Sequence, residues 1–383
     1  MSKTCLSMVI SVFLAASAFA QRNPSYDRLT VPQTRIDVRD LGYSPVDVIP
    51  DGESGITSLS KAPNGDIYGA TSGTRSHLFV LNPQHGYVIP IGVIPGATSV
   101  THAVVISEEE KVFIGTTPAG HLLEYSPCDL DNENIEINKT LPVTDHGMPI
   151  PGESIFALTI DRKANKIYGL TFPNAHFSSY SIATQKFDDL GIIAKAPPAG
   201  EKFEHEKMIS RMLVADGQGN VFASGEDGYF FEFSAKTQTV QKLAIHVPAV
   251  PGREPYARVD AFLLGPSGAI YGGTSDGYLF QLDSDTLTVK NLGKPLNQYR
   301  IAGLAWGPGG KLYGAGGDDS EMARMFLYDT STGSYDLLGF IDVNRRPYFA
   351  WQAYVIGDIV SDDRGTVYLG EDERKSKLYL YFP

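Results

Sequence analysis

Short runs of apolar residues, separated by polar turns, recur along the whole chain. Residues 101–125 contain one copy, with apolar runs at 101–106, 112–116 and 121–125. Short runs rich in β-branched and aromatic residues, bounded by turn residues, are typical of β-strands. The pattern therefore predicts three antiparallel strands joined by tight turns.

The first two strands of this pattern align without gaps in seven copies. The copies begin at Ile56, Thr101, Phe156, Ser210, Val259, Ile301 and Ile356. Several turns carry glycine, as in Asn64-Gly65 and Ser267-Gly268, and glycine supplies the positive φ that tight hairpins favour. A repeat of roughly 45 to 55 residues that contains several short strands predicts a β-propeller.

A Leu-Gly phrase marks a fourth, outer strand in several copies, for example at Leu190-Gly191 and Leu292-Gly293. The chain ends directly after the third strand of the seventh copy, and residues 35–42 carry the same phrase at Leu41-Gly42. We therefore predict that residues 21–383 form one all-β domain. It is a seven-bladed β-propeller of four-stranded antiparallel blades, in which residues 35–42 supply the outer strand of the last blade and close the ring.

Residues 1–20 resemble a secretory signal peptide, with a basic Lys3, an apolar core and small residues before Gln21. We expect a cleaved signal peptide and a secreted or periplasmic protein. No other stretch is apolar enough to span a bilayer, so we expect no membrane anchor. After cleavage only Cys128 remains, which allows no disulfide within the chain. We expect a monomer.

The formal net charge of -12 and the pI near 5.1 argue against nucleic acid as a partner. An anionic ligand would need a local basic pocket. The repeats indicate where such a pocket can form, because they show which side chains share one end of the propeller channel.

Two rings of residues are expected at that end, which we call the mouth. Each inner strand starts there, and the second and third strands of each blade are joined there by a hairpin. The inner ring, taken from the second position of each copy, holds Thr57, His102, Ala157, Arg211, Asp260, Ala302 and Gly357. The hairpin ring, at the start of the third strands, holds His77, His121, His176, Tyr229, Tyr278, Arg324 and Lys377. Packing between blades favours apolar residues or glycine at repeated positions, so imidazoles and cations here indicate a ligand site.

This set of side chains suits β-elimination of a uronic acid, and we predict His102, His121, Arg211 and Tyr229 as catalytic residues. An arginine can neutralise the C6 carboxylate with two parallel hydrogen bonds. A histidine titrates near neutral pH and can take the C5 proton, and the second histidine or Tyr229 can protonate the leaving oxygen at C4.

Other residues near the mouth are predicted to bind the substrate, an anionic polysaccharide or oligosaccharide. They are His77, His176, His205, Arg258, Tyr278, Arg300 and Trp351. Arg258 and Arg300 stand close to Tyr256 and Tyr299 in the sequence. Arginine beside flat aromatic rings suits a sugar that carries a carboxylate or sulfate.

The histidines of residues 101–125, followed by Arg211, resemble the seven-bladed propeller polysaccharide lyases. These are the ulvan lyases and L-rhamnose-α-1,4-D-glucuronate lyases, related to propeller α-L-rhamnosidases. The resemblance covers the whole repeat region. It implies that His102 and His121 act as base or acid, that Arg211 neutralises the uronate, and that a tyrosine such as Tyr229 assists. It also implies a structural Ca²⁺ in the channel, although the sequence has no calcium-binding loop. No cofactor is required for the chemistry.

The expected function is therefore a secreted polysaccharide lyase that cleaves a uronate-containing glycan, such as one with a rhamnose-glucuronate linkage. Two alternatives remain open. One is a glycoside hydrolase of the α-L-rhamnosidase type, although the inner ring offers only Asp260 where ordinary hydrolysis needs two acids. The other is a propeller that binds glycans or proteins without turnover.

Overall fold

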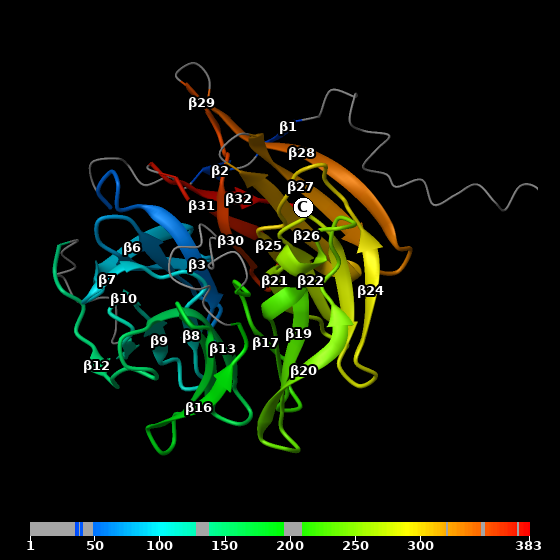
Figure 1. Cartoon of the computed structure of the whole chain (residues 1–383). Helices are drawn as coiled ribbons and strands as arrows, with labels where there is room; N and C mark the ends of the chain where they lie inside the picture. Colours follow the sequence, from blue (N-terminus) through cyan, green and yellow to red (C-terminus); the bar gives the residue numbers. More distant parts are fainter. Residues whose placement is uncertain are drawn as a thin grey trace, which may run out of the picture.

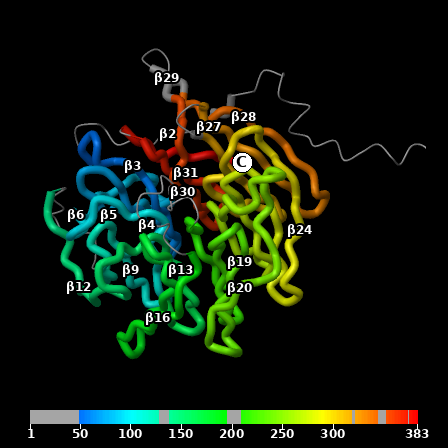
Figure 2. The backbone as a smooth tube through the Cα atoms, in the orientation of Figure 1, coloured from blue at the N-terminus to red at the C-terminus, as the bar shows by residue number. Residues whose placement is uncertain are grey.

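The apolar runs of the sequence form antiparallel strands, and each set of four strands makes one blade of a ring (Figure 1). This computed structural model describes residues 35–37, 39–40, 49–127, 138–194, 209–318, 321–345, 349–373 and 375–383. Seven blades surround a central channel, so the predicted all-β propeller fold is confirmed. Figure 2 follows the chain once round the ring from blue to red, which brings the first and last blades side by side.

In the first four blades, as in blades 5 and 6, the strands follow one another in sequence from the inner to the outer strand. Blade 1 contains β3 (Gly55–Lys61), β4 (Ile67–Ser72), β5 (His77–Asn82) and β6 (Tyr87–Val93). Blade 2 contains β8 (Val104–Ile106), β9 (Val112–Gly115), β11 (Leu122–Tyr125) and β12 (Thr144–Asp145). Blade 3 contains β13 (Ser154–Asp161), β14 (Lys166–Phe172), β15 (His176–Ser181) and β16 (Lys186–Ile192). Blade 4 contains β17 (Val214–Ala215), β18 (Val221–Ser224), β19 (Tyr229–Ser234) and β20 (Thr239–His246).

The last three blades complete the ring. Blade 5 contains β21 (Val259–Leu264), β22 (Ile270–Thr274), β23 (Leu279–Asp283) and β24 (Thr288–Gly293). Blade 6 contains β25 (Gly303–Gly307), β26 (Lys311–Asp318), β27 (Glu321–Asp329) and the long β28 (Ser334–Arg345), which also pairs with β29 (Phe349–Gln352). Blade 7 contains β30 (Ile356–Ser361), β31 (Val367–Glu371) and β32 (Leu378–Tyr381). The remaining short elements are β7 (Ala97–Ser99), β10 (Thr117–Pro118) and the 3-10 turns η2 (Glu226–Gly228), η3 (Glu254–Tyr256) and η4 (Pro308–Gly310).

The N-terminal segment closes the ring, but it does so as two strands instead of one. β2 (Arg39–Asp40) pairs antiparallel with β32 and becomes the fourth strand of blade 7. β1 (Arg35–Asp37) pairs in parallel with β28, the outer strand of blade 6. The segment therefore joins the last two blades and covers the free edge that an open ring would leave.

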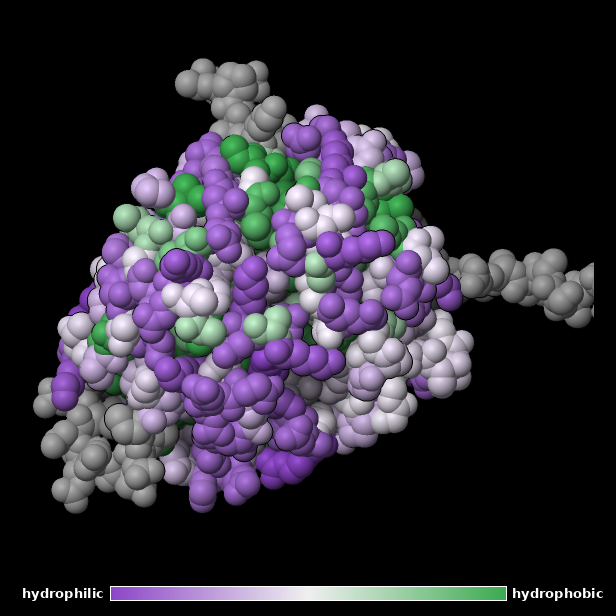
Figure 3. All heavy atoms as spheres, turned by 90° about the horizontal axis from the view of Figure 1, so that it is seen from below, coloured by the Kyte–Doolittle hydropathy of each residue, from purple (hydrophilic) through white to green (hydrophobic). Residues whose placement is uncertain are grey.

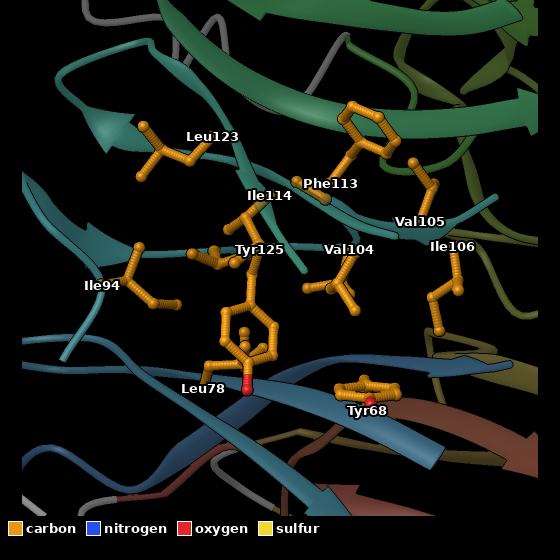
Figure 4. Packing of buried hydrophobic residues seen from close by; sticks show 14 of the residues in the cluster. Tyr68, Leu78, Ile94, Val104, Val105, Ile106, Phe113, Ile114, Leu123 and Tyr125 are labelled. Atoms are coloured by element: carbon orange, nitrogen blue, oxygen red, sulfur yellow. The ribbon is translucent and has the colours of Figure 1, made fainter. Parts of the chain in front are cut away.

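The core lies between the blades, where the faces of neighbouring sheets meet. Figure 4 shows the packing of blades 1 and 2, where Tyr68 and Leu78 of one blade meet Val104 and Ile114 of the next. Within a blade, a phenylalanine of the third strand covers a glycine of the second. A Cβ atom on Gly69 would lie 2.1 Å from Phe79, and one on Gly272 would lie 2.1 Å from Phe280. These glycines are required because the rings occupy the space of a side chain.

Glycines in the hairpins at the mouth allow neighbouring blades to touch. We call the segments that lead from the outer strand of one blade to the inner strand of the next the mouth loops. The hairpin glycine Gly228, with φ of 70°, lies against the carbonyl of Glu254 in the mouth loop of blade 5. Gly277, with φ of 82°, lies against the carbonyl of Gln298 in the mouth loop of blade 6. A Cβ atom would clash at both positions, so glycine is needed for the mouth loops to lie this close to the hairpins.

The alignment without gaps is wrong in blade 3 by one residue. In blade 1, Lys61 pairs with Ile67 across the first hairpin, whereas in blade 3, Asp161 pairs with Lys166, which makes the turn one residue shorter. The inner strands bulge at Thr57, Asp260 and Gly357, and the bulge of blade 3 falls at Phe156. Phe156 therefore replaces Ala157 as the inner-ring residue of blade 3.

No helix in the described part of the chain has the length and apolar character needed to cross a membrane. Seen from below, the surface is dominated by hydrophilic residues, and hydrophobic residues gather mainly in the upper part of the view (Figure 3).

Candidate functional site

The inner ring contains several uncharged residues together with His102, Arg211 and Asp260. A β-bulge turns a side chain out of the regular alternation of a strand, and Asp260 occupies the bulge of β21. His102, just before β8, has a φ of 45°, a left-handed conformation that is uncommon for residues other than glycine. Such a conformation occurs often at functional sites, because the surrounding structure must hold it in place.

Three arginines converge on the carboxylate of Asp260, which is fully buried. Nε of Arg258 donates to Oδ1 of Asp260 at 2.7 Å, and Nε of Arg300 donates to Oδ2 at 2.9 Å. Nε of Arg211 lies 4.0 Å from Oδ1. The arginines come from the start of blade 4 and from the mouth loops of blades 5 and 6, so three blades meet at one carboxylate. We call these four residues the arginine cluster.

The arginine cluster keeps a positive charge over the whole physiological pH range. Burial alone would raise the pKa of Asp260, but the charges of Arg258, Arg300 and Arg211 outweigh it and lower this pKa to about 2. The ionised carboxylate offsets one of three guanidinium charges, so these four groups carry a formal charge of +2. Nη2 of Arg300 is also buried without a hydrogen-bond partner among the described residues. A buried donor without a partner is costly, whereas other parts of the Arg211 and Arg300 side chains, which are 23% and 15% exposed, are accessible from the mouth.

A buried histidine–carboxylate pair lies on another part of the inner ring. Nδ1 of His102 is 3.3 Å from Oδ2 of Asp358, and the two side chains are 1% and 4% exposed. Asp358 also accepts hydrogen bonds from the N–H groups of Leu59 and Ile359, at 2.7 Å and 2.8 Å. Neither ring nitrogen of His102 has a well-formed hydrogen bond within the described chain. A buried imidazole with an unsatisfied nitrogen is uncommon and suits a role in proton transfer.

A chain of hydroxyl groups supports the segment that carries His102. Thr57 Oγ1 lies 2.6 Å from Ser72 Oγ, which lies 2.9 Å from Ser99 Oγ, and Ser99 Oγ lies 3.1 Å from Thr101 Oγ1. The backbone N–H of His102 donates to the carbonyl of Thr57 at 2.9 Å. Blades 1 and 2 thus hold His102 through both side-chain and backbone contacts.

The histidines of the hairpin ring each bind a carboxylate of their own blade. His77 is fully buried, and its Nε2 lies 2.8 Å from Oε2 of Glu53. Nδ1 of His121 lies 2.8 Å from Oδ2 of Asp145, with side chains that are 34% and 50% exposed. Burial opposes ionisation of Asp145, but the hydrogen bonds from His121 and from the N–H of Gly147 lower its pKa.

His176 follows the same pattern as the other two histidines. Its Nδ1 lies 3.0 Å from Oδ2 of Asp189, and its Nε2 lies 3.7 Å from Oε1 of Glu153. The hairpin-ring imidazoles are therefore each bound within one blade, and no hydrogen bond or ion pair in the described structure joins His102 to His121.

The remaining predicted residues lie in several places. The ring of Tyr229 packs against His246 on the outer strand of its blade, with ring centroids 3.7 Å apart, and Nζ of Lys242 lies 4.1 Å from the Tyr229 ring. Tyr278 is half-buried at the start of the third strand of blade 5. Trp351 belongs to β29, but its side chain is not described, and His205 lies outside the described residues.

The two parts of the inner ring lie on opposite sides of the channel. In Figure 1 the inner strand β8 of blade 2 is across the axis from β21 and β25 of blades 5 and 6. A ligand in the mouth can therefore have the arginine cluster on one side and His102 on the other.

Sequence reasoning missed Asp358 as the partner of His102 and did not foresee that Arg211, Arg258 and Arg300 share Asp260. A signal for Asp358 was present. At its position the other blades have Ser58, Ala103, Ala157, Met212, Ala261 and Gly303, so one copy carries a carboxylate where six carry uncharged residues.

The described residues offer little support for a metal site. No three His, Cys, Asp or Glu side chains in the described part of the chain are arranged to hold an ion. The carboxylate of Asp260 is surrounded by the guanidinium groups of Arg258, Arg300 and Arg211, whose positive charges oppose binding of Ca²⁺ there. The structural Ca²⁺ stays a prediction, and no step below depends on it.

Comparisons with known proteins show the fold. No protein-family model and no curated protein sequence matches the chain. A streptogramin B lyase structure is similar with a TM-score of 0.63 and 11% identity, over 90% of this chain and 97% of that chain. A catalytically inactive histidine-to-alanine variant of virginiamycin B lyase from Staphylococcus aureus, with quinupristin, has a TM-score of 0.63 and 10% identity, over 91% and 99%. The WD40 propeller domain of Doa1 has a TM-score of 0.57 and 10% identity, over 90% and 98%. Similar structures thus include a lyase and WD40 propellers.

Proposed function

We propose that this protein is a secreted polysaccharide lyase that cleaves a uronate-containing glycan, such as one with a rhamnose-glucuronate linkage, by β-elimination. The observation that carries the proposal is the arginine cluster, because three guanidinium groups gathered round one carboxylate at the mouth of an acidic protein favour an anionic ligand. Under this proposal the uronate carboxylate binds the accessible parts of Arg211 and Arg300, whose side chains are 23% and 15% exposed.

Neutralising that carboxylate makes the neighbouring C5 proton more acidic. His102 is the proposed base. Its Nδ1 faces Asp358, so a tautomer with the proton on Nδ1 leaves Nε2 to accept the C5 proton. The electron pair of the C5–H bond then forms a C4=C5 double bond, and the C4–O bond breaks.

The leaving oxygen needs a proton from an acid. His121 suits this role better than Tyr229, since its side chain is partly exposed and bound to Asp145, whereas the ring of Tyr229 packs on His246. The contact with Asp145 orients the imidazole of His121.

The test is to incubate the protein with ulvan and with rhamnose-capped arabinogalactan, and to follow the ultraviolet absorbance of an unsaturated uronate. We expect the absorbance to rise with wild type. His102→Ala, His121→Ala and Arg211→Ala should each lower the rate by about 100-fold or more. His85→Ala is the matched control, because His85 is exposed on a hairpin at the other end of blade 1, and it should keep the wild-type rate.

A non-catalytic glycan-binding propeller is the second candidate, favoured by the deep burial of His102, which is 4% exposed. It predicts binding of the same polymers without new absorbance or reducing ends. New reducing ends without absorbance would instead indicate a hydrolase. Wild-type rates in all three variants would contradict the assigned site.

A further inference from the structure

Three exposed tyrosines follow one another round the mouth. Among the described residues the exposed large apolar side chains are Tyr87, Met148, Ile192, Tyr256, Tyr299, Tyr354 and Phe382. Tyr256, Tyr299 and Tyr354, which are 45%, 63% and 38% exposed, lie in the mouth loops of blades 5, 6 and 7. Single exposed apolar side chains are normal, but exposed tyrosines in three consecutive mouth loops indicate a binding surface.

The tyrosines occupy comparable places, each a few residues before an inner strand. Tyr256 precedes β21, Tyr299 precedes β25 and Tyr354 precedes β30. The corresponding loops of blades 1 and 3 carry Glu53 and Glu153 instead, and both side chains are buried. Among the described residues, the exposed tyrosines of the mouth loops therefore lie on the side of blades 5 to 7.

The backbone of each loop is held firmly although its tyrosine is exposed. The carbonyl of Glu254 contacts Gly228. The carbonyl of Tyr354 packs so closely on Gly317 that a Cβ atom at Gly317 would clash with it. Beside Tyr299, the side chain of Gln298 donates to the carbonyl of Met322 at 2.7 Å. Rings on fixed loops lose little conformational freedom on binding, which favours affinity.

Two of the tyrosines are close in sequence to the arginine cluster. Arg258 lies two residues after Tyr256, and Arg300 directly follows Tyr299. Nζ of Lys294 lies 5.5 Å from the centre of the Tyr299 ring. Exposed rings near cations suit a chain of sugar rings that carries negative charges.

We propose that Tyr256, Tyr299 and Tyr354 form a row of sugar-stacking positions that leads from the arginine cluster over blades 5 to 7. This inference rests on the proposed function and extends it: the ligand is an extended anionic polysaccharide, held across several sugar units on one side of the mouth. Blades 1 to 3 do not contribute to this row.

The experiment measures binding separately from turnover. Each tyrosine is changed to alanine in the His102→Ala background, and retardation in gels that contain ulvan gives the affinity. Each change should weaken binding by about fivefold to twentyfold. Tyr87→Ala is the matched control, since Tyr87 is 49% exposed on β6 at the opposite end of the blade, and it should bind as the parent does. Affinity for free glucuronic acid should not change in any of the tyrosine variants.

The outcomes separate this inference from the proposed function. Tyrosine-dependent binding of ulvan without any unsaturated product would retain the row and reject the lyase. Unsaturated product from the wild-type protein, with unchanged affinity in all three variants and an unchanged KM when the same tyrosine changes are made in the protein that retains His102, would retain the lyase and reject the row. If the parent protein binds no ulvan, the row is rejected as well. Equal losses in the Tyr87→Ala control would also overturn it.

Discussion

Ionisable side chains are paired differently on the two sides of the mouth. On blades 1 to 3, His77, His121 and His176 are each bound by carboxylates of their own blade. On blades 4 to 6, Arg211, Arg258 and Arg300 share the single carboxylate of Asp260. Among the described contacts, each of these imidazoles meets at least one carboxylate, whereas three guanidinium groups surround one carboxylate on the other side. The difference shows that similar rings of ionisable residues can be built with opposite ratios of acid to base.

The largest expected effect comes from Asp260→Asn. The change would leave three guanidinium groups facing one another around a buried amide, which should lower the free energy of unfolding by about 3 to 5 kcal/mol. Urea denaturation measures it. Asp363→Asn is the control, since this exposed carboxylate pairs only with Lys61 at the surface and its loss should cost less than about 1 kcal/mol. A stable Asp260→Asn protein would mean that the arginines are held by other groups.

Blade 7 joins the two sides and contains a buried acid, Glu371, that should make stability depend on pH. Burial, the largest cause, raises its pKa to about 8, although hydrogen bonds from Tyr379 and from the N–H of Lys377 act in the opposite direction. Because the folded pKa lies above the ordinary value of 4.5, the folded state binds more protons between these pH values. Stability should therefore fall as pH rises from about 5 to 8, by up to about 1.4 kcal/mol for each pH unit.

Glu371→Gln should reduce this pH dependence. The amide keeps a hydrogen-bond acceptor but does not ionise, so thermal unfolding of the variant should vary less between pH 5 and 8 than that of wild type. Parallel curves for the two proteins would show that Glu371 titrates normally.

A medium effect is expected on the histidine side. His77→Ala would leave Glu53 without its buried partner and should lower the free energy of unfolding by about 2 to 3 kcal/mol, with little change in KM. His77 was predicted to bind substrate, and the opposite result, an altered KM with unchanged stability, would support that role. His85→Ala again supplies an exposed control.

The smallest effect on stability is expected for His121→Ala. The imidazole and Asp145 are both partly exposed, and such pairs contribute less than about 1 kcal/mol. Its melting temperature should stay near that of wild type while the rate of elimination falls. A large loss of stability would show that His121, like His77, has a structural role.

The fold could be predicted from the sequence because the strands carry strong local signals. Apolar runs, hairpin glycines and repeat spacing gave all seven blades and the closing segment. The alignment failed where a turn changed length by one residue, which moved Phe156 into the place of Ala157. The division of residues 35–42 between blades 6 and 7 was also missed, because pairing with β28 and β32 depends on residues distant in sequence.

The site was predictable as a set of residues but not as a set of contacts. Arg211, Arg258 and Arg300 were predicted as site residues from their positions in the repeats. Their common contact with Asp260 depends on the bulge at Asp260 and on how closely two mouth loops pack on the neighbouring hairpins. His77 and His121 occupy the same position of the repeat, so the sequence alone could not distinguish a buried histidine from an exposed one. Only the fold shows that His77 is fully buried and that the side chain of His121 is 34% exposed.

The closing strands also set the order in which the ring can be completed. β2 is made near the start of synthesis, whereas its partner β32 comes close to the end of the chain. Pairing of segments so distant in sequence is slow compared with the formation of hairpins. Blades 1 to 6 can thus form early, while the nascent protein stays an open arc with unpaired strand edges. Until the last strand pairs, such an arc exposes strand edges that can pair with other chains, so incomplete ring closure favours self-association.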